Sequence, residues 1–560
     1  VVMTVSLNKN DLLSGVPSID IQRSRFYRDF KHTTTANSGL LVPFLIDDLL
    51  PATTVNFDTA FVCRMLTPLK PVMDDAWISI FWFFTPYRLL WSHWREFMGE
   101  NTSGPWTQTQ QYLLPHITTS NQQPFTAKGL ADHFGFPTEV GGLSVSHMPF
   151  RAYSLIWNEF FRNQNTDNPT IFYDGDSDTA AKSQQYAALY GNSLLPVARM
   201  HDYFSDSLPT AQKLTAPSSV PIIPASGSDG LMKVYPEAEK FTLPYQHNTL
   251  SVDSGYNYWM LTKVDNTGKL GTISPDSFEQ SGASSIDSSG LYFNNLYAHP
   301  TSTLGTFDIN TLRQAFAIQR YGERLAYGGS RYTEQLQTFY GLSPLDSRLQ
   351  RPEFLGSQTF PINMSQVLQT SATGSTGTPQ GNTAAYSLTG GRGCHVSYST
   401  QEHGVLMGLF CIRHDRSYQQ GINRCWSRRD LYSFYQPCFA NLGNTAILNK
   451  EIYATGDDSD EQVFGYQEAW AEYRYLPNVV SGEMRSNYNQ SLDVYHYGDY
   501  YSSLPTLSSG WMAEGSSEIA RTLAIVNPDE YDQFLLQFHC NIDTVAPMPL
   551  YSVPGLIDHF

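Results

Sequence analysis

The stretch WISIFWFF, residues 77–84, is the richest apolar run in the sequence and ends just before Pro86. Aromatic and β-branched side chains favour β-strands, and eight residues are too few for a typical helix. Apolar side chains stand at both odd and even positions, which point to opposite faces of a strand. The run therefore predicts a strand buried on both faces, in a core or an interface.

The C-terminal part of the chain also has strand patterns. Residues 533–542 alternate apolar and polar side chains, apart from Leu535, which is typical of a strand with one buried face. Residues 403–412 contain a second continuous apolar run, VLMGLFCI, which predicts an interior strand. We therefore expect a mainly β fold, with helices as additions.

Two helices are predicted by apolar spacing. In residues 149–161, apolar side chains recur at Tyr153, Ile156, Trp157, Phe160 and Phe161, the spacing of one helix face. A second helix is expected over residues 310–327, because Asn310 suits the N-cap position and a Gly-Gly pair follows.

Two stretches differ from the rest in composition. Residues 1–60 combine a basic cluster, a polar run and prolines at 43 and 51, and we expect a largely irregular N-terminal arm. Residues 205–310 contain no arginine and have five lysines against ten acidic residues. A loop of this length inside a compact domain is unusual, so we interpret it as a surface insertion.

The overall composition points to assembly. Charged residues make up only 16% of the 560 residues and aromatic residues 14%, whereas soluble domains average about 25% charged. Interfaces between proteins are depleted of charge and enriched in aromatic side chains. The net charge of −17 argues against a general nucleic-acid binder and leaves only local contacts with nucleic acid.

The cysteines and the N-terminus indicate the compartment. Six scattered cysteines predict free thiols in a reducing compartment rather than a dense disulfide framework. We expect neither a classical signal peptide nor a membrane span, since residues 1–13 lack the signal pattern and no apolar run reaches about 18 residues.

No catalytic motif is present, so we expect neither an enzyme nor a cofactor. The sequence lacks G-x-S-x-G and H-E-x-x-H, and its Gly268-Lys269 pair is followed by leucine. Cys411 and His414 do not match common zinc spacings, and the acidic runs at 174–178 and 457–460 do not match an EF-hand. Buried thiols and solvated turns are the favoured interpretations, and no metal site is predicted.

Basic side chains cluster in two places. The candidates for contact with DNA are Arg23, Arg25, Arg28 and Lys31 in the arm, with Arg424, Arg428 and Arg429 near several aromatic residues. Arginine with aromatic rings is the pairing that binds single-stranded nucleic acid, and it also dominates protein interfaces. Both interpretations stay open from the residues alone. The candidates for core or assembly contacts are the aromatic residues Trp77, Trp82, Phe83, Trp91 and Trp94.

Several motifs together resemble one protein family. The matching stretches are PVMD at 71–74, IFWFFTPYRLLW at 80–91, REFMGE at 95–100, HDYF at 201–204, LRQAF at 312–316, GSRYTE at 329–334, RLQRPEFLG at 348–356 and AWAEYRY at 469–475. They run in order along most of the chain and closely resemble the major capsid protein of gokushovirus-type microviruses.

The resemblance implies a viral jelly roll, an eight-stranded antiparallel β-barrel with a few helices and a large inserted surface projection. It further implies a T=1 shell of sixty copies, assembled through pentamers and threefold contacts in the host cytoplasm, around single-stranded DNA. The implied partners are a small basic DNA-binding protein, an internal scaffolding protein, a DNA pilot protein and a host surface receptor. The runner-up is a non-viral β-protein that binds or hydrolyses carbohydrate, which a deep pocket of Trp and carboxylates in a stable monomer would favour.

The resemblance also refines the domain boundaries. We expect the arm at 1–60, a first part of the jelly roll at 61–214, the threefold projection at 215–298 and a second part at 299–560. The sequence departs from the family at LPTAQKL, residues 208–214, where the family has LPWPQKG.

Overall fold

The computed structural model describes residues 22–100, 112–121, 124–176, 193–213, 309–329, 331–371, 380–524 and 531–551, and four short strands between residues 235 and 297. The chain divides into two compact units, Val1–Leu214 with Arg320–Phe560, and Thr215–Gln319. In the second unit, β7 (Tyr235–Pro236) pairs with β10 (Leu296–Tyr297), and β8 (Thr262–Val264) pairs with β9 (Leu270–Thr272).

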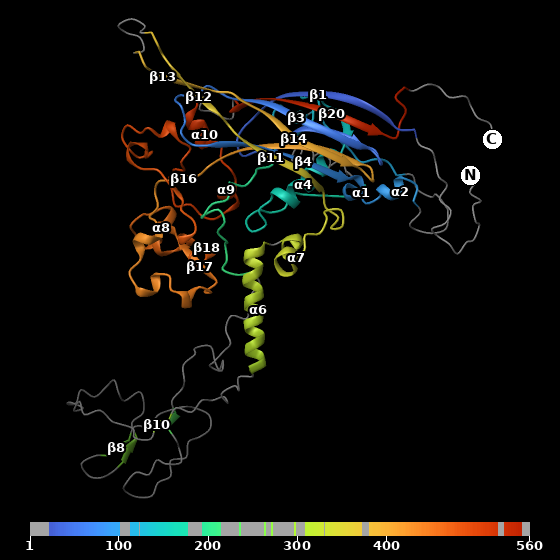
Figure 1. Cartoon of the computed structure of the whole chain (residues 1–560). Coiled ribbons are helices and arrows are strands. Elements are labelled where there is room, and N and C mark those ends of the chain that lie inside the picture. The colour runs from blue at the N-terminus through green and yellow to red at the C-terminus, as the bar shows by residue number, and fades with distance from the viewer. Residues whose placement is uncertain are drawn as a thin grey trace, which may run out of the picture. The chain divides into compact units, whose positions relative to one another are not determined.

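Eight strands of the first unit form two four-stranded sheets (Figure 1). The first sheet has the order β1 (Ser24–Ala36), β20 (Phe534–Ala546), β3 (Thr54–Met65), β14 (Thr389–Ser399). The second has the order β11 (Glu353–Pro361), β4 (Ala76–Pro86), β15 (Gly404–His414), β2 (Val42–Leu49). All neighbours are antiparallel. This order and alternation between two sheets is the jelly-roll arrangement, so the predicted fold class is confirmed.

The core lies between the two sheets, and a second apolar cluster covers the far face of the second sheet. In β4, Ile80, Trp82 and Phe84 belong to the core between the sheets, whereas Phe83 belongs to the second cluster. Alternate residues of β15 divide between the clusters in the same way. Burial on both faces explains the continuous apolar runs, and both strand predictions are confirmed.

Strand β20 shows the opposite pattern. Its side chains alternate between buried and partly or fully exposed along its whole length, because only one face of the first sheet contacts the core. Leu535 breaks the sequence pattern and lies on the exposed face. The predicted strand at 533–542 is therefore confirmed and extends to Ala546.

The prediction of a largely irregular arm at 1–60 is wrong for residues 24–60, most of which belong to β1, β2 and β3. The polar run of β1 was misleading because β1 is an edge strand with one exposed face, where threonines are well tolerated. Pro43 lies in β2, also an edge strand, where a missing backbone N–H is tolerated. Pro51 lies in the turn between β2 and β3.

Both predicted helices are present. Helix α4 (Met148–Ile156) continues into a π-helical turn at Trp157–Phe161 and covers the second sheet from below in Figure 1. Helix α6 spans Ile309–Gly328, and Gly329, at φ +88°, provides the left-handed stop. The other α-helices in the described part of the chain are α1 (Tyr87–Leu90), α2 (Trp94–Phe97), α3 (Leu130–His133), α7 (Tyr332–Tyr340), α8 (Asn449–Ile452), α9 (Ser509–Met512) and α10 (Ser517–Thr522).

Short strand pairs occupy the connections between the main strands. The connection from β15 to β20, residues 415–533, packs around a small core of its own that includes Tyr203 and Phe204. The pairs are β5 (His116–Thr118) with β6 (Ser144–Ser146), β12 (Met364–Leu368) with β13 (Thr383–Ser387), β16 (Ser417–Tyr418) with β19 (Asn478–Val479), and β17 (Asn444–Leu448) with β18 (Val463–Glu468). Among the described residues, no helix is long and apolar enough to span a bilayer.

Candidate functional site

The cysteine, histidine and aspartate residues considered as metal ligands do not form a metal site in the described part of the chain. No three His, Cys, Asp or Glu side chains there form a group that could hold an ion. Cys411 is buried beneath the second sheet, whereas Cys425 and Cys438 are exposed. Asp457 and Asp460 accept hydrogen bonds from neighbouring groups of their own turn.

The five aromatic candidates lie along one stretch of chain but in different environments. Trp82 fills the space between the sheets, with its ring centroid 4.2 Å from that of Phe57 and 5.1 Å from that of Phe44. Phe83 and Trp91 are buried in the cluster on the far face of the second sheet. Trp77 and Trp94 are only partly buried.

The four basic arm candidates lie on or just before β1, and most of them have partners within the chain. Arg25 forms an ion pair with Asp543 at 2.6 Å, and Arg28 pairs with Asp47 of β2, which links the edges of the two sheets. Arg23 donates a hydrogen bond to a backbone carbonyl. Lys31 is exposed and has no ion-pair partner among the described residues.

The strand register places Lys31 in a row of basic side chains. Lys31 is opposite His539 on β20, His539 is opposite Ala60 on β3, and Ala60 is opposite Arg392 on β14. All four residues point away from the core, and Arg392 is largely exposed. We call Lys31, His539 and Arg392 the basic row; it reaches three of the four strands of the first sheet, because β3 contributes Ala60, and Arg392 lies 3.9 Å from Asp58 of β3. The sequence analysis missed His539 and Arg392, although the polar alternation of residues 533–542 already indicated the exposed face of β20.

The second basic cluster is mostly neutralised inside the chain. Arg428 lies 3.3 Å from Glu472 and stacks over the ring of Tyr473 at 4.3 Å. Arg424 approaches Glu451 and Glu472 at 3.7 and 4.0 Å. Burial raises the pKa of Glu451, although Arg424 opposes that shift. Arg429 is exposed.

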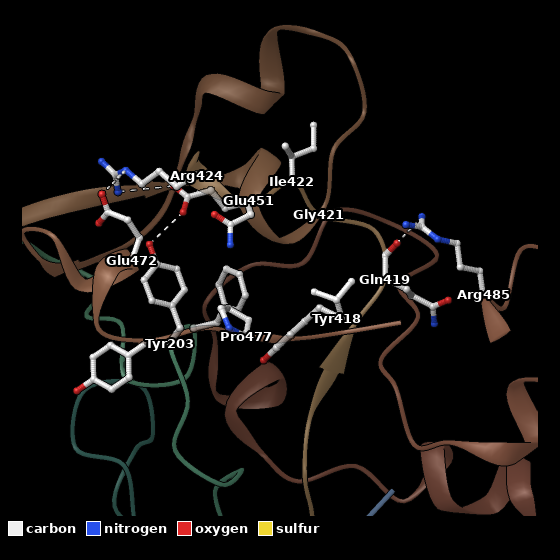
Figure 2. Close-up of a pocket in the computed structure, with 14 residues that line it drawn as sticks. Tyr203, Tyr418, Gln419, Gly421, Ile422, Arg424, Glu451, Glu472, Pro477 and Arg485 are labelled. Carbon is white, nitrogen blue, oxygen red and sulfur yellow. Dashed lines mark hydrogen bonds and ion pairs between the residues drawn. The ribbon is translucent and has the colours of Figure 1, made fainter. Parts of the chain in front are cut away.

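A pocket lies next to this cluster, in the connection between β15 and β20. Figure 2 shows Arg424, Glu451, Glu472 and Tyr203 gathered at one end, and Arg485 donating a hydrogen bond to the Gln419 carbonyl at the other. Tyr203 donates to Glu451 at 3.0 Å. Tyr203, Arg424 and Arg428 occupy the carboxylates of Glu451 and Glu472. These two carboxylates therefore differ from the acid–base pair of a hydrolytic site, which must exchange protons with a substrate.

A buried network of charges joins the end of β15 to the connection that follows it. The side chains of Arg199, His414, Arg416, Asp499 and Glu514 are almost completely buried. Arg416 donates to Asp499 at 2.6 Å and to Glu514 at 2.7 Å, and Arg199 donates to Asp499 at 2.7 Å. The network was not predicted, since its members are separated by up to about 300 residues and form no motif.

The charges of this network depend on one another. Burial alone would raise the pKa of Asp499, but Arg416 and Arg199 lower it to about 2. The same balance of burial against Arg416 and His414 lowers the pKa of Glu514 to about 2. Removing one member leaves an uncompensated buried charge, which makes the network a structural anchor.

The chain is similar to known proteins over nearly its whole length. The family model described as "Capsid protein (F protein)" matches residues 14–556. "Capsid protein VP1" of Bdellovibrio phage phiMH2K is 35% identical over 548 residues, which cover 97% of both chains. "Capsid protein VP1" of Chlamydia phage 1 is 33% identical with 97% of both chains covered, and that of Spiroplasma virus 4 is 33% identical with 96% covered.

Proposed function

The chain belongs to the capsid protein (F protein) family, and from this we propose that sixty copies form a T=1 icosahedral shell around single-stranded DNA. The family assignment made from the sequence motifs is confirmed. The protein is accordingly a structural component of a virion that assembles with itself, not an enzyme.

The jelly-roll sheet order is the observation that best supports a shell-forming role. Two four-stranded sheets packed face to face give a rigid block, because β4 and β15 are buried on both faces. Long connections between the strands then supply surfaces for contacts without disturbing the block. Sedimentation of the chain expressed alone tests this role, since closed particles are expected and a stable monomer would contradict it.

We propose that DNA contacts the basic row of Lys31, His539 and Arg392 on the first sheet. Lys31 has no carboxylate partner among the described residues, and Arg392 stays 76% exposed although Asp58 lies 3.9 Å away, so both can contact a phosphate backbone. Closer ion pairs already occupy Arg25, Arg28 and Arg428. Contacts from a few side chains also agree with the net charge of −17, which leaves most neutralisation of the DNA to ions or to a small basic protein.

The salt dependence of single-strand binding tests this placement. The double variant Lys31→Gln/Arg392→Gln is expected to lower the slope of log affinity against log salt by roughly 0.7 for each phosphate that the chain no longer neutralises. The control Arg424→Gln removes a charge that lies against Glu451 and Glu472 and is expected to leave the slope unchanged. An unchanged slope in the double variant, or an equal decrease in the control, would contradict the proposal.

We propose that residues 215–298 form the projection at the threefold axes and meet the host receptor. This interpretation is supported by the separate compact unit Thr215–Gln319 and by the arginine-free, net acidic composition of the segment. From the same family membership we propose an internal scaffolding protein, a DNA pilot protein and a small basic protein as further partners.

Replacing residues 215–298 with a short linker tests the attachment role. The entropy of closing a loop changes slowly with length, so the two sheets are expected to fold without the segment. The expected particles assemble but do not bind host cells. A matched control shortens residues 372–379, between β12 and β13, and is expected to bind normally. Loss of the folded subunit, or unchanged attachment, would refute the proposal.

A further inference from the structure

One segment of the connection between β15 and β20 has a defined conformation without any core of its own. From residue 421 to residue 446 no residue is buried. The segment nevertheless forms three short 3₁₀ helices, η5 (Arg424–Ser427), η6 (Leu431–Ser433) and η7 (Pro437–Phe439). Ordering a chain costs about 1–2 kcal/mol per residue, which buried apolar surface normally offsets.

Large apolar side chains of this segment are exposed, together with those of the neighbouring stretch at 473–479. Trp426 is 81% exposed, Leu431 70% and Leu476 82%. We call this surface the aromatic face, and its members are Ile422, Trp426, Leu431, Tyr432, Phe434, Tyr435, Tyr473, Tyr475, Leu476 and Val479.

Two features hold the stretches of the aromatic face together. Arg428 lies over the rings of Tyr473 and Phe434, at 4.3 and 5.5 Å from their centroids. The pocket of Figure 2 is lined by residues of both stretches, Ile422 from the first and Tyr475 and Val479 from the second. The two stretches of the face therefore meet at Arg428 and at a hollow, the form in which an interface receives an anchoring side chain.

The charges of the aromatic face do not suit a nucleic acid. Arg424 and Arg428 lie against Glu451 and Glu472, and the exposed Arg429 is followed by Asp430. From residue 421 to 442 there is no lysine and no glutamate. Enrichment in aromatic residues and arginine with depletion of lysine and acids is the composition of a protein interface.

We propose that the aromatic face binds a second copy of this chain and is an assembly contact of the shell. An aromatic side chain has roughly 150–250 Å² of surface, and the aromatic members are between 45% and 81% exposed, so together with the aliphatic members the face exposes roughly 1,000 Å². Each partner buries about 800 Å² in a standard interface. The largest apolar patch of a typical monomer is only about 300–600 Å². The inference rests on the proposed function, because only an assembling chain brings a second copy to this face.

Charged substitutions matched for exposure test the contact. Leu431→Asp and Leu476→Asp each place a carboxylate on the face. The control for Leu431→Asp is Leu345→Asp, since both leucines are 70% exposed. The control for Leu476→Asp is Leu113→Asp, since both leucines are 82% exposed, and the two control residues lie outside the face. We expect the two face variants to lower particle yield about tenfold or more and the two controls to lower it less than twofold. All four positions are exposed, so circular dichroism and the urea midpoint of the free subunits are expected to match the unsubstituted chain.

Two cysteines provide a second measurement that does not alter the face. Cys425 and Cys438 lie in the segment and are exposed, whereas Cys63, Cys411 and Cys540 are buried. We expect maleimide to label Cys425 and Cys438 rapidly in free subunits and at least tenfold more slowly in particles of the purified chain, as measured by peptide mass spectrometry.

The outcomes separate failure of the proposed function from failure of the docking inference. If the unsubstituted chain forms no particles, the proposed function fails. If it forms particles while the face variants assemble normally, or lose yield no more than the controls do, the docking inference fails alone. Equal labelling in particles and free subunits overturns the inference, as does protection that develops only after another viral protein or DNA is added.

Discussion

Trp82 packs between the two sheets and contacts aromatic side chains of both. It is fully buried, and its ring lies against Phe44 of β2 and Phe57 of β3. Truncating a core tryptophan to alanine costs about 3–5 kcal/mol, since the cavity between rigid sheets cannot collapse. Trp82→Ala is therefore expected to lower the free energy of unfolding of the isolated subunit by that amount, measured as a shift in the urea midpoint.

Trp82→Phe is the matched control. The indole N–H of Trp82 is buried and has no hydrogen-bond partner among the described residues. Phenylalanine keeps most of the ring contacts and removes this unpaired donor, which costs about 1–3 kcal/mol. We expect the phenylalanine variant to lose less than about half of what the alanine variant loses. Equal losses, or an alanine variant as stable as the unsubstituted chain, would refute the placement of Trp82 in the core.

Three further predictions concern buried groups. Burial lowers the pKa of His133 to about 4, below its ordinary value of about 6.5, so the unfolded chain binds a proton more readily than the folded chain does. The free energy of unfolding is therefore expected to fall as the pH drops from about 6.5 to 4. His133→Asn is expected to reduce this pH dependence, as measured by urea titrations at several pH values. Arg416→Met leaves Asp499 and Glu514 buried without their main counter-charge and is expected to lower the free energy of unfolding by about 3–5 kcal/mol. In the unsubstituted chain, the stability that the network provides is expected to be lost only as the pH falls from about 4 toward 2, where both carboxylates take up protons. Gly408→Ala is expected to cost about 1–3 kcal/mol in thermal unfolding, because its Cβ would lie under 3.0 Å from two rings of the core; an unchanged midpoint would contradict that packing.

The strands that the sequence predicted well are those whose side-chain pattern is set by burial alone. Residues 77–84 and 403–412 are continuously apolar because β4 and β15 are covered on both faces, and residues 533–542 alternate because β20 is covered on one. The edge strands β1 and β2 were not predicted. The exposed positions of β1 carry polar residues and β2 contains Pro43, so neither shows a clear strand pattern of apolar side chains.

The candidate contacts were predicted less completely than the fold. The clustering of basic residues in the sequence identified Lys31. It did not indicate that Arg25 pairs with Asp543, more than 500 residues away, or that Arg28 pairs with Asp47 of β2. Spacing along the chain cannot show which acid neutralises which arginine, because antiparallel pairing between distant strands decides it. The buried network around Arg416 was invisible for the same reason.

The central claim is that copies of this chain close into an icosahedral shell through its jelly-roll block. Cryo-electron microscopy of the purified, DNA-free protein tests it most directly. We expect closed particles with icosahedral symmetry and sixty copies, roughly 3.8 MDa for chains of 63.0 kDa, with the order β1-β20-β3-β14 and β11-β4-β15-β2 in each subunit. Monodisperse monomers, open aggregates, or closed particles with another copy number would contradict the account.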